Sequence, residues 1–125
     1  MTHDELSIDL KAEGDSLIFK LRGSLDLATS PTVRAALLDA TQKGKQNIVI
    51  DLTQLEFLDS TGLGALIGAH RRATEHQGSF KLIVAEGSIA RLLTITGLMR
   101  VFAVYHTLDD AVADHARVSS SLPSV

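Results

Sequence analysis

Hydrophobic and polar residues alternate in two segments near the start of the chain, over residues 6–10 and 17–21. A two-residue period is typical of β-strands that bury one face. A turn-forming Glu-Gly-Asp cluster at residues 13–15 separates the two segments. The pattern therefore predicts an antiparallel hairpin.

Two short, continuously apolar runs follow at residues 48–50 and 82–84. Such runs are typical of strands that are covered on both faces. Between them, residues 63–70 carry their apolar side chains at helical spacing. The order strand, helix, strand predicts a right-handed parallel crossover, with Ile50 and Val84 buried in adjacent parallel strands.

Capping signals and helical spacing predict three more helices, over residues 30–44, 88–97 and 107–116. The residues expected to cap them are Ser30, Ser88 and Thr107. Residues 101–105 are expected to form a short edge strand. Residues 117–125 show no period and are expected to be a disordered tail. These elements predict one α/β domain over residues 1–116.

Charge and composition exclude several classes of partner. The chain has 12 Lys and Arg against 15 Asp and Glu, a net charge of −3, and only 4% aromatic residues. Direct nucleic-acid binding is not expected, because it normally needs a basic face and aromatic stacking platforms. The absence of Cys excludes a disulfide framework and fits a cytoplasmic protein. No signal peptide and no apolar run of the ~18 residues that span a membrane are present, so no membrane partner is expected.

Signatures of metal, nucleotide or catalytic chemistry are weak. The 5 His residues show no metal-ligand spacing, and Gly44-Lys45 lacks the upstream glycine of a phosphate-binding loop. No metal site and no cofactor are therefore predicted. Asp51 closes an apolar strand as the phosphoacceptor of a response-regulator receiver does, but that receiver's other acidic and lysine positions are missing. We interpret Asp51 as a strand-end residue that accepts local backbone N–H groups.

The most informative stretch is residues 57–64. Asp59 or Ser60 can cap the helix that follows, which places the Ser60 hydroxyl at the helix N-terminus. Gly62 and Gly64 remove side chains from the first turn, so that another surface can approach this hydroxyl. Free N–H groups and the helix dipole would favour a phosphate there. The residues alone leave both a simple capping role, which is the commoner one, and a phosphoacceptor role open.

The stretch Leu-Asp-Ser-Thr-Gly-Leu-Gly at residues 58–64, preceded by Asn-Ile-Val-Ile-Asp-Leu at 47–52, resembles the signature of anti-sigma factor antagonists. These proteins are stand-alone STAS domains. Residues 23–27 are similar to the family's Gly-x-Leu-Asp element, and residues 97–102 resemble its C-terminal segment. The likeness extends over about residues 5–115. Ser24 departs from the pattern, since many relatives carry an acidic residue there.

The resemblance implies a mixed sheet flanked by about four helices, and a role in partner switching rather than catalysis. In this family the unmodified protein binds an anti-sigma factor that is also a serine kinase, which frees the sigma factor. The kinase phosphorylates the serine that matches Ser60, the complex breaks, and a serine phosphatase restores it. Asp26 is expected to lie close to Ser60. The residues expected to support the site or contact the partner are Asp26, Asp59, Thr61, Gly62, Leu63 and Gly64.

Two rival functions stay open from the sequence. The first is a STAS subunit of another assembly, such as a lipid-transport complex or a multi-protein stress-sensing particle. The second is a small hydrolase that uses Ser60 as its nucleophile, although no base or oxyanion hole is identified for it. The intact Asp-Ser-Thr-Gly run at residues 59–62 favours the phosphorylation switch over the first rival.

Overall fold

The computed structural model describes residues 5–44 and 47–113. Its five strands form one sheet in the order β1-β2-β3-β4-β5, in which β1 and β2 are antiparallel and the later pairs are parallel. The predicted hairpin and the predicted mixed sheet are confirmed. The strands are β1 (Leu6–Glu13), β2 (Ser16–Leu25), β3 (Asn47–Leu58), β4 (Ser79–Ile83) and β5 (Ala103–Tyr105).

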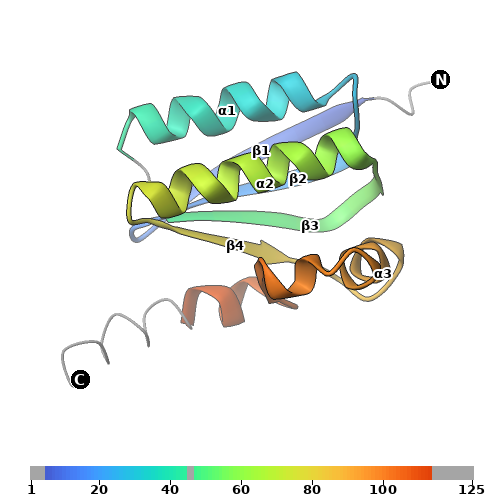
Figure 1. The fold of residues 1–125 in the computed structure, drawn as a ribbon. Coiled ribbons are helices and arrows are strands. Elements are labelled where there is room, and N and C mark those ends of the chain that lie inside the picture. Colours follow the sequence, from blue (N-terminus) through green and yellow to red (C-terminus); the bar gives the residue numbers. More distant parts are fainter. Residues whose placement is uncertain (1–4, 45–46, 114–125) are drawn as a thin grey trace.

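Helices α1 and α2 lie side by side on one face of the sheet (Figure 1). The helices are α1 (Ser30–Gln42), α2 (Ser60–Glu75) and α3 (Ser88–Ile95), followed by the short 3-10 helix η1 (Leu98–Arg100). A further helix begins at residue 108. The predicted domain end at residue 116 and the predicted tail over residues 117–125 lie outside the described residues.

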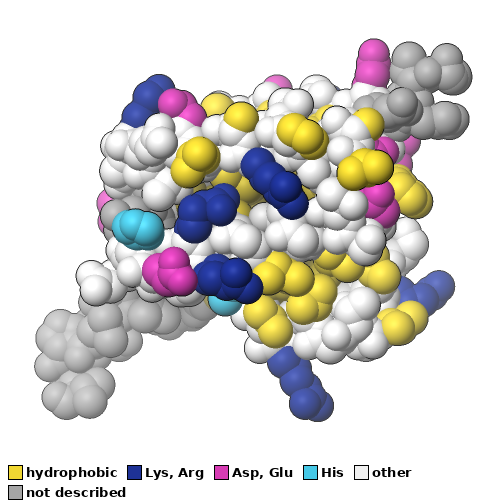
Figure 2. Space-filling view, turned by 45° about the horizontal axis from the view of Figure 1, so that its top comes forward, with side chains coloured by type: hydrophobic (Ala, Val, Ile, Leu, Met, Phe, Trp, Pro, Cys, Tyr) yellow, Lys and Arg dark blue, Asp and Glu magenta, His cyan; other side chains and the backbone are white. Residues whose placement is uncertain are grey.

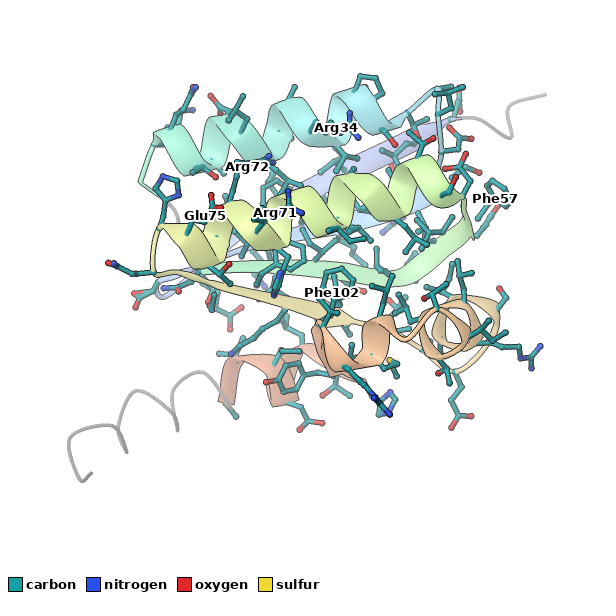
Figure 3. All side chains as sticks on the ribbon, viewed as in Figure 1. Arg34, Phe57, Arg71, Arg72, Glu75 and Phe102 are labelled. Carbon is teal, nitrogen blue, oxygen red and sulfur yellow. The ribbon has the colours of Figure 1, made fainter. Side chains whose placement is uncertain are left out.

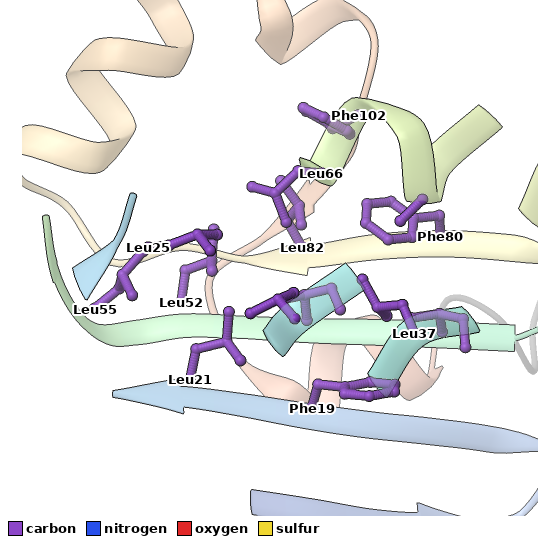
Figure 4. Close-up of a cluster of buried hydrophobic side chains, with 14 of the residues drawn as sticks. Phe19, Leu21, Leu25, Leu37, Leu52, Leu55, Leu66, Phe80, Leu82 and Phe102 are labelled. Atoms are coloured by element: carbon purple, nitrogen blue, oxygen red, sulfur yellow. The ribbon is translucent and has the colours of Figure 1, made fainter. Parts of the chain in front are cut away.

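The main core fills the space between the sheet and the two large helices (Figure 4). Phe19 and Leu21 point from β2 to the same side because alternate strand residues share a face. They meet Leu37 of α1 and Leu66 of α2, which explains the helical spacing of the apolar residues in both helices.

A smaller cluster on the opposite face explains why the central strands are continuously apolar. Ile18, Val49 and Ile83 pack there against Ala111 of the last helix. The ammonium group of the buried Lys81 donates to the Ala111 carbonyl over 2.8 Å and fastens this helix to the sheet. The central strands are therefore buried on both faces, as predicted.

Two of the three predicted helix caps are wrong by one residue. Thr29, not Ser30, is the N-cap of α1, because the Ser30 hydroxyl donates back to the Asp26 carbonyl. Gly87, not Ser88, precedes α3, and its φ of 143° is one that residues with a side chain rarely adopt. The Thr107 cap is confirmed, since its hydroxyl oxygen accepts from the N–H of Asp110 at 3.1 Å.

The crossover prediction is confirmed at Ile50, which is fully buried and pairs with Leu82 of the adjacent parallel strand. Val84 is buried as well, but it lies one residue beyond the end of β4. Its N–H donates to the carbonyl of Tyr105 at 2.9 Å, so it extends the contact between β4 and β5.

We expect Ile50→Ala to lower the free energy of unfolding by about 2–5 kcal/mol, because it leaves a cavity in the centre of the main core. Urea denaturation monitored by circular dichroism measures the change. Leu38→Ala, at an exposed position on α1, is the control and should change stability little. An Ile50→Ala protein that melts within a degree of wild type would contradict this placement.

Candidate functional site

The site lies where the carboxyl ends of β2 and β3 meet, since Leu25 and Leu58 are register partners in these parallel strands. The chain leaves β2 into the loop before α1, and leaves β3 directly into α2. Two hydrogen bonds join these segments. The N–H of Asp59 donates to the Leu25 carbonyl at 3.3 Å, and the N–H of Leu27 donates to Oδ2 of Asp59 at 3.2 Å.

Asp59 is the N-cap of α2, which decides between the two predicted caps. Its Oδ1 accepts from the N–H of Gly62 at 2.9 Å, and its backbone is extended. Both carboxylate oxygens of Asp59 therefore accept backbone N–H groups, one from each segment. Ser60 follows as the first residue of α2 and is exposed, as the sequence predicted for its hydroxyl.

The two glycines of the first turn have different roles, which corrects the expectation that both expose Ser60. Gly62 is buried, and a Cβ there would run into the Leu25 carbonyl and come within 2.8 Å of Leu58 Cδ1. Its small size lets α2 begin against the end of β2. Only Gly64 fits the expectation, because it is exposed and a Cβ there would meet nothing within 4 Å.

Asp26 organises the loop between β2 and α1. Its Oδ1 accepts from the N–H groups of Ala28 and Thr29 at 3.0 and 3.1 Å, and its own N–H donates to Thr29 Oγ1 at 3.0 Å. The Thr29 hydroxyl in turn donates to the Ser24 carbonyl at 2.8 Å. Asp26 is thus a turn aspartate that supports its own loop, and it lies at the same end of the sheet as Ser60.

Two apolar residues at this end were not singled out from the sequence. The exposed fraction is 73% for Leu27 and 52% for Phe57, and both line a shallow hollow together with Asp26, Ala28 and Asp59. Their one sequence signal is that each is a large apolar residue beside a motif residue. Of the other predicted contact residues, Thr61 is half-buried and Leu63 belongs to the main core.

The family described as the STAS domain matches residues 7–111. The chain belongs to the STAS domain family. It is 30% identical over 115 residues to the anti-sigma F factor antagonist of Paenibacillus polymyxa, which covers 91% of this chain and 98% of the relative.

Solved structures show the same fold. An anti-sigma factor antagonist from Mycobacterium paratuberculosis superposes with a TM-score of 0.82 at 27% identity, covering 89% of this chain and 94% of that one. The Bacillus cell fate determinant SpoIIAA in its phosphorylated form gives a TM-score of 0.65 at 22% identity, covering 86% of this chain and 98% of that one.

Charge is distributed unevenly over this STAS domain. Asp26 and Phe57 also line a second hollow together with Ser24 and Glu56. Among the described residues that line these two hollows there is no Lys or Arg, while Arg22 shares an adjacent hollow with Glu56. Basic side chains gather instead over the helices (Figure 2). They include Arg34 on α1 and Arg71 and Arg72 on α2 (Figure 3). Asp51 accepts from the N–H of Thr53 at 2.9 Å, as predicted. The expectation that Asp51 ends its strand is wrong, because β3 continues to Leu58.

Within residues 5–44 and 47–113, no helix of the STAS domain combines the length and hydropathy that a bilayer-spanning segment requires.

The two glycines offer a matched test of how α2 is positioned. We expect Gly62→Ala to destabilise the STAS domain by about 1–3 kcal/mol, because the added methyl group displaces the main chain at Leu25. Gly64→Ala should be neutral or stabilise by up to ~1 kcal/mol, because Ala favours helix and the space is open. Urea unfolding of both variants measures the difference. Equal stabilities would show that α2 does not depend on this close approach.

Proposed function

We propose that this STAS domain is an anti-sigma factor antagonist that acts by partner switching. Unphosphorylated, it binds an anti-sigma factor with serine kinase activity and frees a sigma factor in the cytoplasm, where transcription takes place. Phosphorylation of Ser60 releases it, and a serine phosphatase restores it. The observation that carries the proposal is the exposed Ser60 hydroxyl at the Asp59-capped start of α2, within a chain whose relatives are named anti-sigma factor antagonists.

The local structure supports a phosphorylated state that stays folded. Ser60 is exposed, so the phosphate can remain hydrated. It would lie in the first turn of α2, where the helix dipole stabilises negative charge. SpoIIAA, which shares the fold, has a structure solved in the phosphorylated form. Phosphorylation should therefore change the surface of the protein without unfolding it.

The negative charge of a phosphate on Ser60 disfavours the complex with the anti-sigma factor. A phosphate adds about −1.5 to −2 charges at neutral pH, next to the carboxylate of Asp59 and at the same sheet end as Asp26. A partner surface fitted to a neutral hydroxyl would then have to desolvate a dianion. Mismatched charge costs several kcal/mol, and each ~1.4 kcal/mol is about tenfold in affinity.

A regulatory role also fits the surroundings of the hydroxyl better than hydrolysis does. Nδ1 of His76 and Nδ1 of His106 each form a hydrogen bond with a backbone carbonyl. The ring of His70 packs edge-on against Phe80 and Phe102. Among the described residues, none of these rings is paired with Ser60 as a general base would be. The base for phosphoryl transfer would come from the kinase.

We expect Ser60 to be the residue that the anti-sigma factor phosphorylates. The anti-sigma factor that copurifies with the chain from its source cell is incubated with ATP and with wild-type, Ser60→Ala or Thr61→Ala protein. Peptide mapping should find phosphate on Ser60 in the wild type and in Thr61→Ala, and none in Ser60→Ala. Phosphate on Thr61 alone would refute the assignment. Copurification of transporter subunits with unmodified Ser60 would instead favour a role in another assembly.

A charged mimic separates folding from binding. We expect Ser60→Asp to fold normally, because residue 60 is exposed and its charge suits the helix N-terminus. Its affinity for the anti-sigma factor should fall about a hundredfold, which corresponds to about 3 kcal/mol. Circular dichroism tests the fold and isothermal titration calorimetry tests binding, with Ser60→Ala as the control that keeps its affinity. Unchanged binding by Ser60→Asp would contradict the charge mechanism.

A further inference from the structure

Leu27 and Phe57, called here the apolar pair, expose large hydrophobic side chains that the fold does not use. They come from different segments, yet both line the shallow hollow that also contains Asp26 and Asp59. Figure 3 shows Phe57 projecting outward at the end of the molecule where α2 begins. The main core closes without either residue, since Leu25 and Leu58 beside them supply its buried side chains here. The apolar pair is therefore free to be buried by another molecule.

The polar groups around the apolar pair are already engaged within the chain. The carboxylate of Asp59 accepts two backbone N–H groups, and Oδ1 of Asp26 accepts two more. Glu56, the neighbour of Phe57 in β3, adds a third carboxylate. Arg22 is the nearest cation among the described lining residues, and it lies in an adjacent hollow that Glu56 also lines, away from Asp26 and Asp59. The surface thus combines an apolar centre with an acidic rim.

We propose that the apolar pair is the anchor by which the anti-sigma factor holds this protein. This inference rests on the proposed function and specifies the partner's surface. That surface has an apolar pocket that receives Leu27 and Phe57, and Lys or Arg side chains at its edge that face Asp26 and Glu56. Charge complementarity at the rim guides association, while burial of the anchors determines how long the complex lasts.

The anchor gives the phosphorylation switch a physical cause. Burial of the apolar pair excludes water from the neighbouring surface that includes Ser60, so a phosphate there loses its hydration when the complex forms. The partner's cations are already matched by the rim carboxylates. The phosphate therefore enters an apolar contact without a counter-charge, which makes release favourable.

The chain offers controls of matched exposure for a test. Leu27→Ser and Phe57→Ser should each weaken binding of the anti-sigma factor by about tenfold to a hundredfold, as expected for the loss of a buried apolar anchor. Ile95→Ser on α3 removes a side chain that is 74% exposed, and Leu10→Ser on β1 one that is 56% exposed. Both controls should bind as wild type does. Isothermal titration calorimetry gives the dissociation constants, and circular dichroism verifies that every variant is folded.

The rim is tested by association kinetics. Glu56→Lys should slow association several-fold at low salt, and raising the salt concentration should reduce the difference. Glu75→Lys makes the same change of charge at the far end of α2 and should leave the association rate nearly unchanged. Surface plasmon resonance with the immobilised anti-sigma factor measures both rates.

The outcomes separate this inference from the proposed function. If the wild type binds the anti-sigma factor and the Leu27 and Phe57 variants bind equally well, the anchor is wrong while the proposed function stands. Equal weakening by the Ile95 and Leu10 variants would also overturn the anchor, because it would show no preference for the site. A wild-type protein that binds no anti-sigma factor overturns both.

Discussion

The start of α2 lies against the end of β2 with no side chain between them, and the arrangement of the site depends on this close approach. Gly62 makes it possible, because a Cβ at that position would occupy the space of the Leu25 carbonyl. The same carbonyl accepts the N–H of Asp59, so the contact is polar as well as steric. One short stretch thereby determines where the helix begins and which way its first residue, Ser60, faces.

Asp59 extends this contact into a connection between two loops. One oxygen of its carboxylate holds the first turn of α2, and the other holds the loop after β2 through the N–H of Leu27. Asp26 stabilises that loop from within. The motif aspartates therefore act first as acceptors for backbone groups, and their charge acts on a partner only through the field at the surface. The Ser60 hydroxyl on this support therefore has a defined position at the exposed start of α2.

The division between core and surface suits a protein that is switched by modification. The main core is built by β2, β3 and β4, by the inward faces of α1, α2 and α3, and by Phe102, and Ser60 is not part of it. Under the proposed function, a phosphate at Ser60 would therefore alter binding at little cost to folding. Leu27 and Phe57 lie on the same outer surface, which is why their exposure is tolerated by the fold and is available to a partner.

Local patterns in the sequence determined most of the fold. Three patterns depend only on neighbours within a few residues: the two-residue period of the hairpin, the continuously apolar central strands and the helical spacing in α2. All three are confirmed. For the same reason, the sequence could identify Asp59 as one of two possible N-caps of α2. The sequence could not predict that Thr29 rather than Ser30 is the N-cap of α1, because the choice depends on the hydrogen bonds that Asp26 forms within its loop.

Only the tertiary structure decided how the site is composed. A glycine is needed at position 62 because a Cβ there would run into the carbonyl of Leu25, which belongs to β2. No local pattern in the sequence shows that these two residues meet. Leu27 and Phe57 share one hollow because β2 and β3 run parallel with Leu25 opposite Leu58, which brings their carboxyl ends together. Sequence periodicity shows which side chains face the core. It does not show which exposed side chains become neighbours, because strand register and helix placement are set by packing across the whole sheet.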